Sequence, residues 1–79
     1  MTRYYFDVRE DASCIRDDEG VELAGGKSAE QEALKAASEM ARSTFCEGAR
    51  DFLSVDVRDE EGPLLNVTLG LTVTRLRRF

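Results

Sequence analysis

Two acidic hexamers hold runs of adjacent carboxylates, and clustered carboxylates are the side chains that bind divalent cations. Residues 15–20 read IRDDEG and residues 57–62 read VRDEEG, so the same pattern occurs twice in the chain. Cation-binding loops place their ligands on alternate residues and end on a further bidentate acid, which neither hexamer does. The carboxylates that such a site would use are Asp17, Asp18 and Glu19, or Asp59, Glu60 and Glu61. We expect no metal site and no cofactor, and we interpret both hexamers as turns.

The turn interpretation depends on the first acid and the glycine of each hexamer. Asp59 and Gly62 occupy the first and last positions of a four-residue turn, and Asp17 and Gly20 repeat the arrangement. An aspartate at the first position can accept a hydrogen bond from the backbone N–H two residues on. A glycine at the last position takes a positive φ angle without steric penalty. The acids between these positions then need only be solvated.

The residue types that usually carry catalysis are scarce. The sequence has no histidine, which removes the commonest base near neutral pH and the commonest transition-metal ligand. It contains no G-x-S-x-G, no G-x-x-x-x-G-K-[ST] and no Rossmann glycine pattern. We therefore expect that the protein is not an enzyme and that it has no catalytic residues.

The two cysteines and the amino-terminal residues bear on localisation. Cys14 and Cys46 lie far apart and fit no C-x-x-C pattern, so we expect two small, partly buried thiols in a reducing compartment. The segment MTRYYFDVRED reaches acidic residues at once, which argues against a signal peptide. No stretch approaches the roughly 20 apolar residues of a membrane helix. We predict a cytoplasmic protein without membrane association.

Composition and charge limit the class of partner. With 79 residues, 42% hydrophobic and 34% charged, the chain has the composition of one globular domain, which we assign to residues 1–79. The formal net charge of −5 argues against a nucleic-acid backbone as the main partner. The basic sequence RLRR at 75–78 keeps nucleic-acid binding as the alternative.

Alternating apolar and polar side chains predict strands at residues 3–9, 52–58 and 64–73, and a short return strand at residues 14–16. An alternation of period two is typical of a strand that is buried on one face. Residues 64–73 show it most clearly. One face of this strand should lie on the core, and the other should face solvent or a partner.

A helix is predicted at residues 29–43, where good helix formers dominate. Ser28 and Gln31 have the spacing of a capping box at its start, and Gly48 follows its end. One helical stripe comprises Ala33, Leu34, Ala37, Met40, Ala41, Thr44 and Phe45. Because the stripe is mostly alanine, the helix should lie close against a sheet.

The order of these segments resembles a known family. An aromatic strand (RYYFDVRED), DDEGVEL, an alanine-rich helix with EMAR, VDVRDEEG and a final aliphatic strand follow one another along nearly the whole chain. This set is similar to a family of short alphaproteobacterial proteins, common in rhizobia, that is catalogued as a domain of unknown function. The GG at residues 25–26 departs from the Pro-Asp or similar pair that the family often has there. The resemblance implies no activity and no catalytic residues.

These observations predict an α+β fold in the order ββαββ. Four strands form a mostly antiparallel sheet, and one helix packs on one face. A strand order of 2-1-3-4 makes every neighbour antiparallel and allows a right-handed crossover. The core is expected to contain the helix stripe and the inward side chains of Tyr4, Phe6, Val8, Leu53, Val55, Val67 and Leu69.

The strand order also suggests a function. It places residues 64–73 at the edge of the sheet, with no charge between Leu64 and Thr74 and with Pro63 only at the start. Such an edge favours pairing with another strand. We therefore expect a small cytoplasmic protein-interaction or regulatory module, homodimeric through its last strand; the alternative is a nucleic-acid-associated protein that uses the arginine-rich tail. The expected interaction residues are Asn66, Thr68, Gly70, Thr72, Arg75, Arg77, Arg78 and Phe79.

Overall fold

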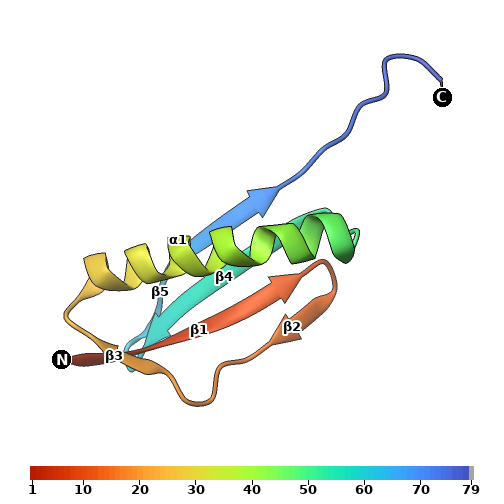
Figure 1. Cartoon of the computed structure of the whole chain (residues 1–79). Helices are drawn as coiled ribbons and strands as arrows, with labels where there is room; N and C mark the ends of the chain where they lie inside the picture. Colours follow the sequence, from red (N-terminus) through yellow and green to blue (C-terminus); the bar gives the residue numbers. More distant parts are fainter. Residues whose placement is uncertain (79) are drawn as a thin grey trace.

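Alternating side chains organise the chain into an antiparallel sheet with a long helix on one face (Figure 1). The computed structural model describes residues 1–78. In the described residues the elements are β1 (Thr2–Glu10), β2 (Ser13–Ile15), β3 (Val21–Leu23), α1 (Gly26–Arg42), the π-helix η1 (Ser43–Glu47), β4 (Phe52–Asp59) and β5 (Gly62–Gly70). The α+β class and the single helix layer are confirmed.

The sheet has the order β2-β1-β4-β5, and β3 also pairs with β1. Each pairing is antiparallel. The predicted 2-1-3-4 order is therefore confirmed, with β4 and β5 as the third and fourth strands. β3 is a fifth strand that the sequence-based assignment missed. It follows β2 along the same edge of β1, because the chain continues beside β1 after the acidic hexamer at residues 15–20 (Figure 1).

The start of α1 differs from the prediction. The helix begins at Gly26, Gly25 is its N-cap, and no side chain caps it. The first backbone bond runs from the N–H of Ala29 to the carbonyl of Gly25 at 3.0 Å, so Ser28 already lies inside the helix. The predicted capping box of Ser28 and Gln31 is therefore wrong. A glycine N-cap leaves the first N–H groups of the helix without a side-chain acceptor.

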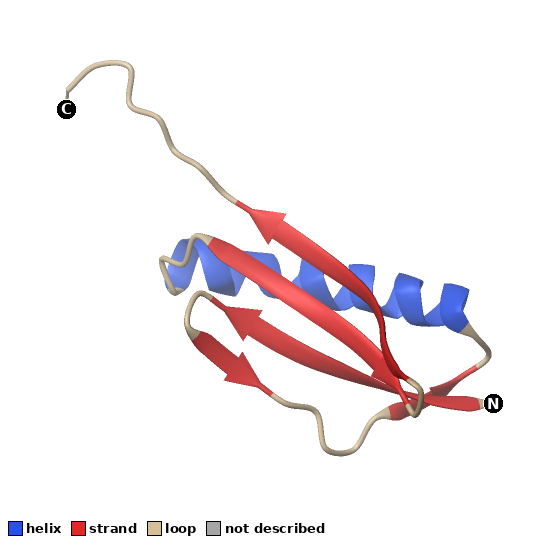
Figure 2. Ribbon diagram, turned by 180° about the vertical axis from the view of Figure 1, so that it is seen from behind, coloured by secondary structure: helices blue, strands red, loops and turns tan. Residues whose placement is uncertain are grey.

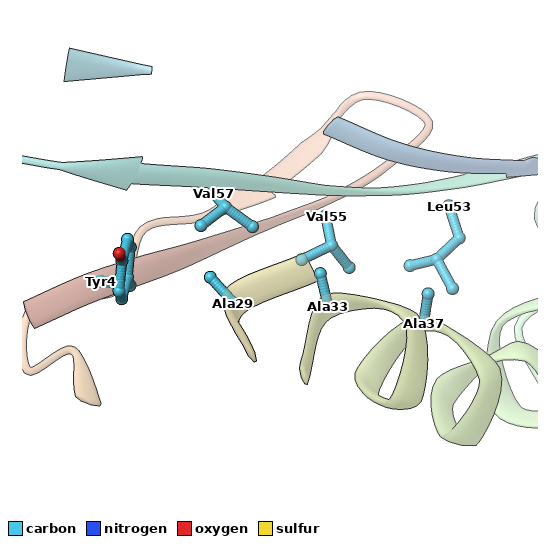
Figure 3. Close-up of a cluster of buried hydrophobic side chains, with 7 residues drawn as sticks. All are labelled: Tyr4, Ala29, Ala33, Ala37, Leu53, Val55 and Val57. Atoms are coloured by element: carbon cyan, nitrogen blue, oxygen red, sulfur yellow. The ribbon is translucent and has the colours of Figure 1, made fainter. Parts of the chain in front are cut away.

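The core lies between α1 and the central strand β4. Figure 3 shows Ala33 facing Val55 and Ala37 facing Leu53, and all four residues are buried. Small side chains let the helix approach the sheet closely, as the alanine stripe predicted. Tyr4, Ala29 and Val57 complete the buried cluster, and Phe6, Val8, Met40, Phe45, Leu65, Val67 and Leu69 pack partly buried around it. Leu34 was predicted to lie in the stripe but is 48% exposed, because it is rotated about 100° from Ala33 around the helix axis.

The two cysteines are both exposed and free, so the predicted partial burial of the thiols is wrong. Cys14 lies on the short strand β2 and Cys46 in η1, both at the periphery of the fold. Thiol titration of the native protein without denaturant should therefore count two accessible thiols per chain. Detection by mass spectrometry of an intramolecular Cys14–Cys46 bridge in freshly prepared protein would contradict this expectation.

Candidate functional site

The candidate site is the side of β5 that faces away from β4, which we call the open edge. β5 is the last strand in the sheet order, so no strand of the described chain pairs with this side. The strand ends at Gly70, which lies opposite Phe52, the first residue of β4. The prediction of a strand over 64–73 was therefore too long, and Thr72 lies outside β5. The ladder ends there because β4 begins at Phe52, and one further bond to Asp51 follows it.

One hydrogen bond shows which backbone groups face the open edge. The N–H of Leu71 donates to the carbonyl of Asp51 at 3.1 Å, on the side of β4. Backbone polar groups in a strand point alternately to its two sides. The N–H and C=O groups of Asn66, Thr68 and Gly70 therefore point toward the open edge. These are the three strand residues that the sequence predicted as interaction residues.

Figure 2 shows that α1 covers only one face of the sheet. The side chains of Asn66 and Thr68 alternate with those of Val67 and Leu69, which pack against the core, so they lie on the other face. The amide of Asn66 donates to the hydroxyl of Ser54 at 2.5 Å and to a carboxylate oxygen of Asp56 at 2.6 Å. The hydroxyl of Thr68 donates to the side-chain oxygen of Asn66 at 2.5 Å. Arg9 closes the row with a 2.8 Å bond from Nε to Asp56. This row strengthens the register of β5 on β4, which the packing of Val67 and Leu69 against the core already sets, and it leaves the backbone of β5 available at the open edge.

A second polar cluster lies on the same face around Arg58. Its Nε donates to Asp7 at 2.9 Å, and its Nη2 donates to the carbonyl of Asp17 at 2.8 Å. The guanidinium also lies over the ring of Tyr5, 4.4 Å from the centroid. Arg58 thus joins β4 to β1 and to the loop between β2 and β3. Because its Nε and Nη2 bond within the chain and one face of the guanidinium lies over Tyr5, we interpret the cluster as structural.

At the other edge of the sheet, the side chain of Asp17 bonds to the backbone of β1 between the segments that pair with β2 and β3. Between β2 and β3, its Oδ2 accepts the backbone N–H of Phe6 at 3.0 Å. Its Oδ1 accepts the N–H groups of Glu19 and Gly20, both at 3.0 Å. Its own N–H donates to Asp7 at 2.9 Å. One carboxylate therefore satisfies the backbone of β1 and forms the turn at the same time.

Both carboxylates of this cluster are more acidic than usual. Burial opposes the ionisation of Asp7, but the hydrogen bonds from Arg58 and from the N–H of Asp17 outweigh it and lower its pKa. Burial likewise opposes the ionisation of Asp17, and the N–H groups of Gly20, Phe6 and Glu19 outweigh it, so its pKa is also lowered. Both groups are therefore ionised near neutral pH, as a permanent acceptor for backbone N–H groups requires.

The turn interpretation of the two hexamers is confirmed. Asp59 accepts the N–H of Glu61 at 2.8 Å, which is the same bond that Asp17 makes to Glu19. Gly20 and Gly62 both have positive φ angles, of 70° and 118°. Within residues 1–78, no group of three His, Cys, Asp or Glu side chains has a geometry that could hold a metal ion.

The C-terminal arm, residues 71–78, runs away from the sheet in both views (Figures 1 and 2). Leu71 is 49% exposed, Val73 78% and Leu76 93%. Arg75, Arg77 and Arg78 lie on the arm among these apolar side chains, and predicted residue Phe79 lies outside the described residues. The arm thus presents apolar and basic side chains together, beyond the last residue of β5.

A shallow hollow of about 430 Å³ lies near the start of β5, beside the first turn of α1. Leu64 and Leu65 form its strand side, and Gly26, Lys27 and Glu30 form its helix side. Leu64 is 44% exposed. The hollow and the open edge both include residues of β5.

Comparisons with known proteins place the chain in a family. No helix among residues 1–78 has the length and apolar character needed to span a membrane. No curated protein and no solved structure matches the chain significantly. The family model described as Domain of unknown function (DUF6894) matches residues 3–70, which includes α1 and all the strands except the first residue of β1, but not the arm. The chain therefore belongs to the DUF6894 family.

Proposed function

We propose that this protein is a small cytoplasmic protein-interaction or regulatory module that binds an extended segment along the open edge of β5. The observation that carries the proposal is the row of backbone groups at Asn66, Thr68 and Gly70, which point away from β4. An added strand would bond to these groups, and the side chains beside it would set specificity. We also propose that the family is alphaproteobacterial and that the protein is not an enzyme.

The contrast between the two edges of the sheet supports this choice. The edge formed by β2 and β3 consists of two three-residue strands, separated by the hexamer whose Asp17 already occupies the N–H of Phe6. Short strands and inserted charges are the usual protection against edge pairing. β5 has nine residues and no charge from Leu64 to Thr74. Its only such protection is Pro63 and a register shift opposite Val57 and Arg58, both near its start.

A lysine at position 68 should abolish binding at the open edge and leave the fold intact. Thr68 is exposed, and Asn66 keeps its bonds to Ser54 and Asp56 when the hydroxyl of Thr68 is lost. Thr68→Lys should therefore leave β5 in register in the free protein, but a charge beside an incoming strand opposes pairing. Ser38→Lys, on the exposed surface of α1, adds the same charge elsewhere and is the matched control. In captures from native lysate, proteins held by the parent and by Ser38→Lys should be lost with Thr68→Lys, while circular dichroism stays unchanged.

Two outcomes of the capture would contradict this function. If the same proteins bind to Thr68→Lys, the open edge is not the binding site. If only nucleic acid is recovered and a modest rise in salt removes it, binding takes place through phosphate contacts. The arginines of the arm would then carry the function, as in the alternative derived from the sequence.

A further inference from the structure

We propose that the segment that occupies the open edge is β5 of a second copy of this chain, paired antiparallel about a two-fold axis at Thr68. In this dimer Leu71 on the arm of each copy covers Leu65 of the other copy. The inference rests on the proposed function, because it names the partner of the open edge. It is carried by the register, the exposed apolar residues and the distribution of charge.

The register follows from which residues present their backbone to the edge. In a two-fold antiparallel pair, the residue on the axis faces its own copy, and the axis can fall on any residue from Asn66 to Gly70. With Thr68 on the axis, Leu71 lies opposite Leu65. With Asn66 on the axis, Leu71 would lie opposite Glu61, and with Gly70 on the axis, Leu65 would lie opposite an arginine. An axis on Val67 or Leu69 would also pair apolar side chains, but it would match the backbone of Gly70 with Leu64 at the register shift, or that of Asn66 with Thr72 beyond β5. The Thr68 axis alone matches the three open-edge residues with one another and also places Leu71 opposite Leu65.

The exposed apolar surfaces of the two copies then cover each other. The N–H of Leu71 bonds to Asp51 as it would in a continued strand. Its side chain therefore follows the alternation of Leu65 and Leu69 toward the helix side of the sheet. It is 49% exposed in the single chain. Leu65 lines the hollow between β5 and the first turn of α1. The hollow of one copy thus receives the leucine of the other, and symmetry repeats the contact.

Charge favours the same arrangement. The arm carries three of the eleven basic residues of the chain and no acid, and all sixteen acidic residues precede it. In the Thr68 register the arm continues past the start of the other β5 toward the acidic turn of residues 59–61. Arg75 then reaches the level of Glu61. A basic arm beside an acidic turn favours this pairing and opposes a register that would leave the two turns facing each other.

Cysteine cross-linking tests the register directly. In a Cys14→Ser, Cys46→Ser background, Thr68→Cys places two thiols opposite each other across the axis, with Cα atoms about 5.5 Å apart, within the range for a disulfide. Asn66→Cys or Gly70→Cys alone leaves the thiols about 13 Å apart along the strands. Mild oxidation should cross-link Thr68→Cys and the Asn66→Cys, Gly70→Cys double variant, but neither single control.

Light scattering of the protein without added cysteines provides the second readout. The parent should be a dimer at high micromolar concentration. Leu71→Gln should raise the dissociation constant at least tenfold, because two half-exposed leucines lose their partner. Leu34→Gln is the matched control, since Leu34 is 48% exposed on α1; its dissociation constant should match that of the parent.

The outcomes separate this inference from the proposed function. A monomeric parent at high micromolar concentration overturns the inference; the proposed function still stands if Thr68→Lys loses lysate proteins that Ser38→Lys retains. Cross-linking of Asn66→Cys or Gly70→Cys alone, as fast as that of Thr68→Cys, overturns the register. If Leu71→Gln and Leu34→Gln change the dissociation constant of the dimer equally, the arm does not contribute to the dimer contact.

Discussion

Replacing Asp17 by alanine should lower the free energy of unfolding by about 3 kcal/mol. The carboxylate accepts three backbone N–H groups, from Phe6, Glu19 and Gly20. Water can replace it at the exposed turn, but the N–H of Phe6 is partly buried and would lose its acceptor. A domain of 79 residues has a total stability of roughly 4–12 kcal/mol. The loss should therefore be plain in a urea melt.

Two further alanine substitutions show how large the effect of Asp17→Ala on the free energy of unfolding is by comparison. Asp18→Ala should change stability by less than about 0.5 kcal/mol, because Asp18 is exposed. Asp59→Ala should cost about 1 kcal/mol, since Asp59 accepts only the N–H of Glu61 in an exposed turn. If Asp17→Ala is no more destabilising than Asp18→Ala, the bond from the N–H of Phe6 to the carboxylate of Asp17 does not stabilise this edge of the sheet.

The same carboxylates give a pH dependence with a definite sign. The pKa values of Asp7 and Asp17 in the folded chain lie below the ordinary value of 3.8. Their contribution to stability is therefore fully present above that value, and it is lost as the pH falls through the lower folded-state values. Urea melts of the parent from pH 7 to pH 3 should show a loss of stability below about pH 4. Asp17→Ala should show a shallower loss over the same range.

Replacing Gly20 by alanine should have the second-largest effect, a loss of about 2–3 kcal/mol. A Cβ atom at this position would lie 2.8 Å from the carbonyl oxygen of Tyr4 and 2.9 Å from Cε1 of Tyr5. The φ angle of 70° adds strain for any residue with a Cβ. Because the backbone of β1 is held by β4 on its other side, it has little room to move away.

The equivalent glycine of the second hexamer is the control. Gly62 has a φ angle of 118°, and no atom lies within 4 Å of a Cβ added there. Gly62→Ala should therefore cost only the backbone strain, about 1 kcal/mol. Denaturant melts in which Gly62→Ala loses more stability than Gly20→Ala would contradict the close approach of Gly20 to β1.

The period-two pattern was enough to predict the central strands and their faces. Alternation in β4 and β5 correctly separated the side chains toward α1 from those on the polar face, because burial on one face selects apolar residues at every second position. The alanine stripe correctly predicted close packing of helix on sheet. Given this pattern, antiparallel neighbours with a right-handed crossover led to the observed order and to β5 at the edge.

The features that the sequence did not reveal depend on contacts between distant residues. Alternation with the inward Phe6 and Val55 implies that Asp7 and Arg58 lie on the polar face, but their ion pair requires the register of β1 on β4. β3 is only three residues long and is held by its pairing with β1 rather than by a pattern of its own. Thr72 falls outside β5 because the strand ends where β4 begins.

Amide exchange along β5 tests most directly whether a second strand occupies the open edge. At high micromolar concentration, the amides of Asn66, Thr68 and Gly70 should exchange as slowly as those of Val67 and Leu69, which face β4. On dilution below the dissociation constant, the first three should exchange fast while Val67 and Leu69 stay protected. Fast exchange at Asn66, Thr68 and Gly70 at every concentration would contradict pairing with a second copy.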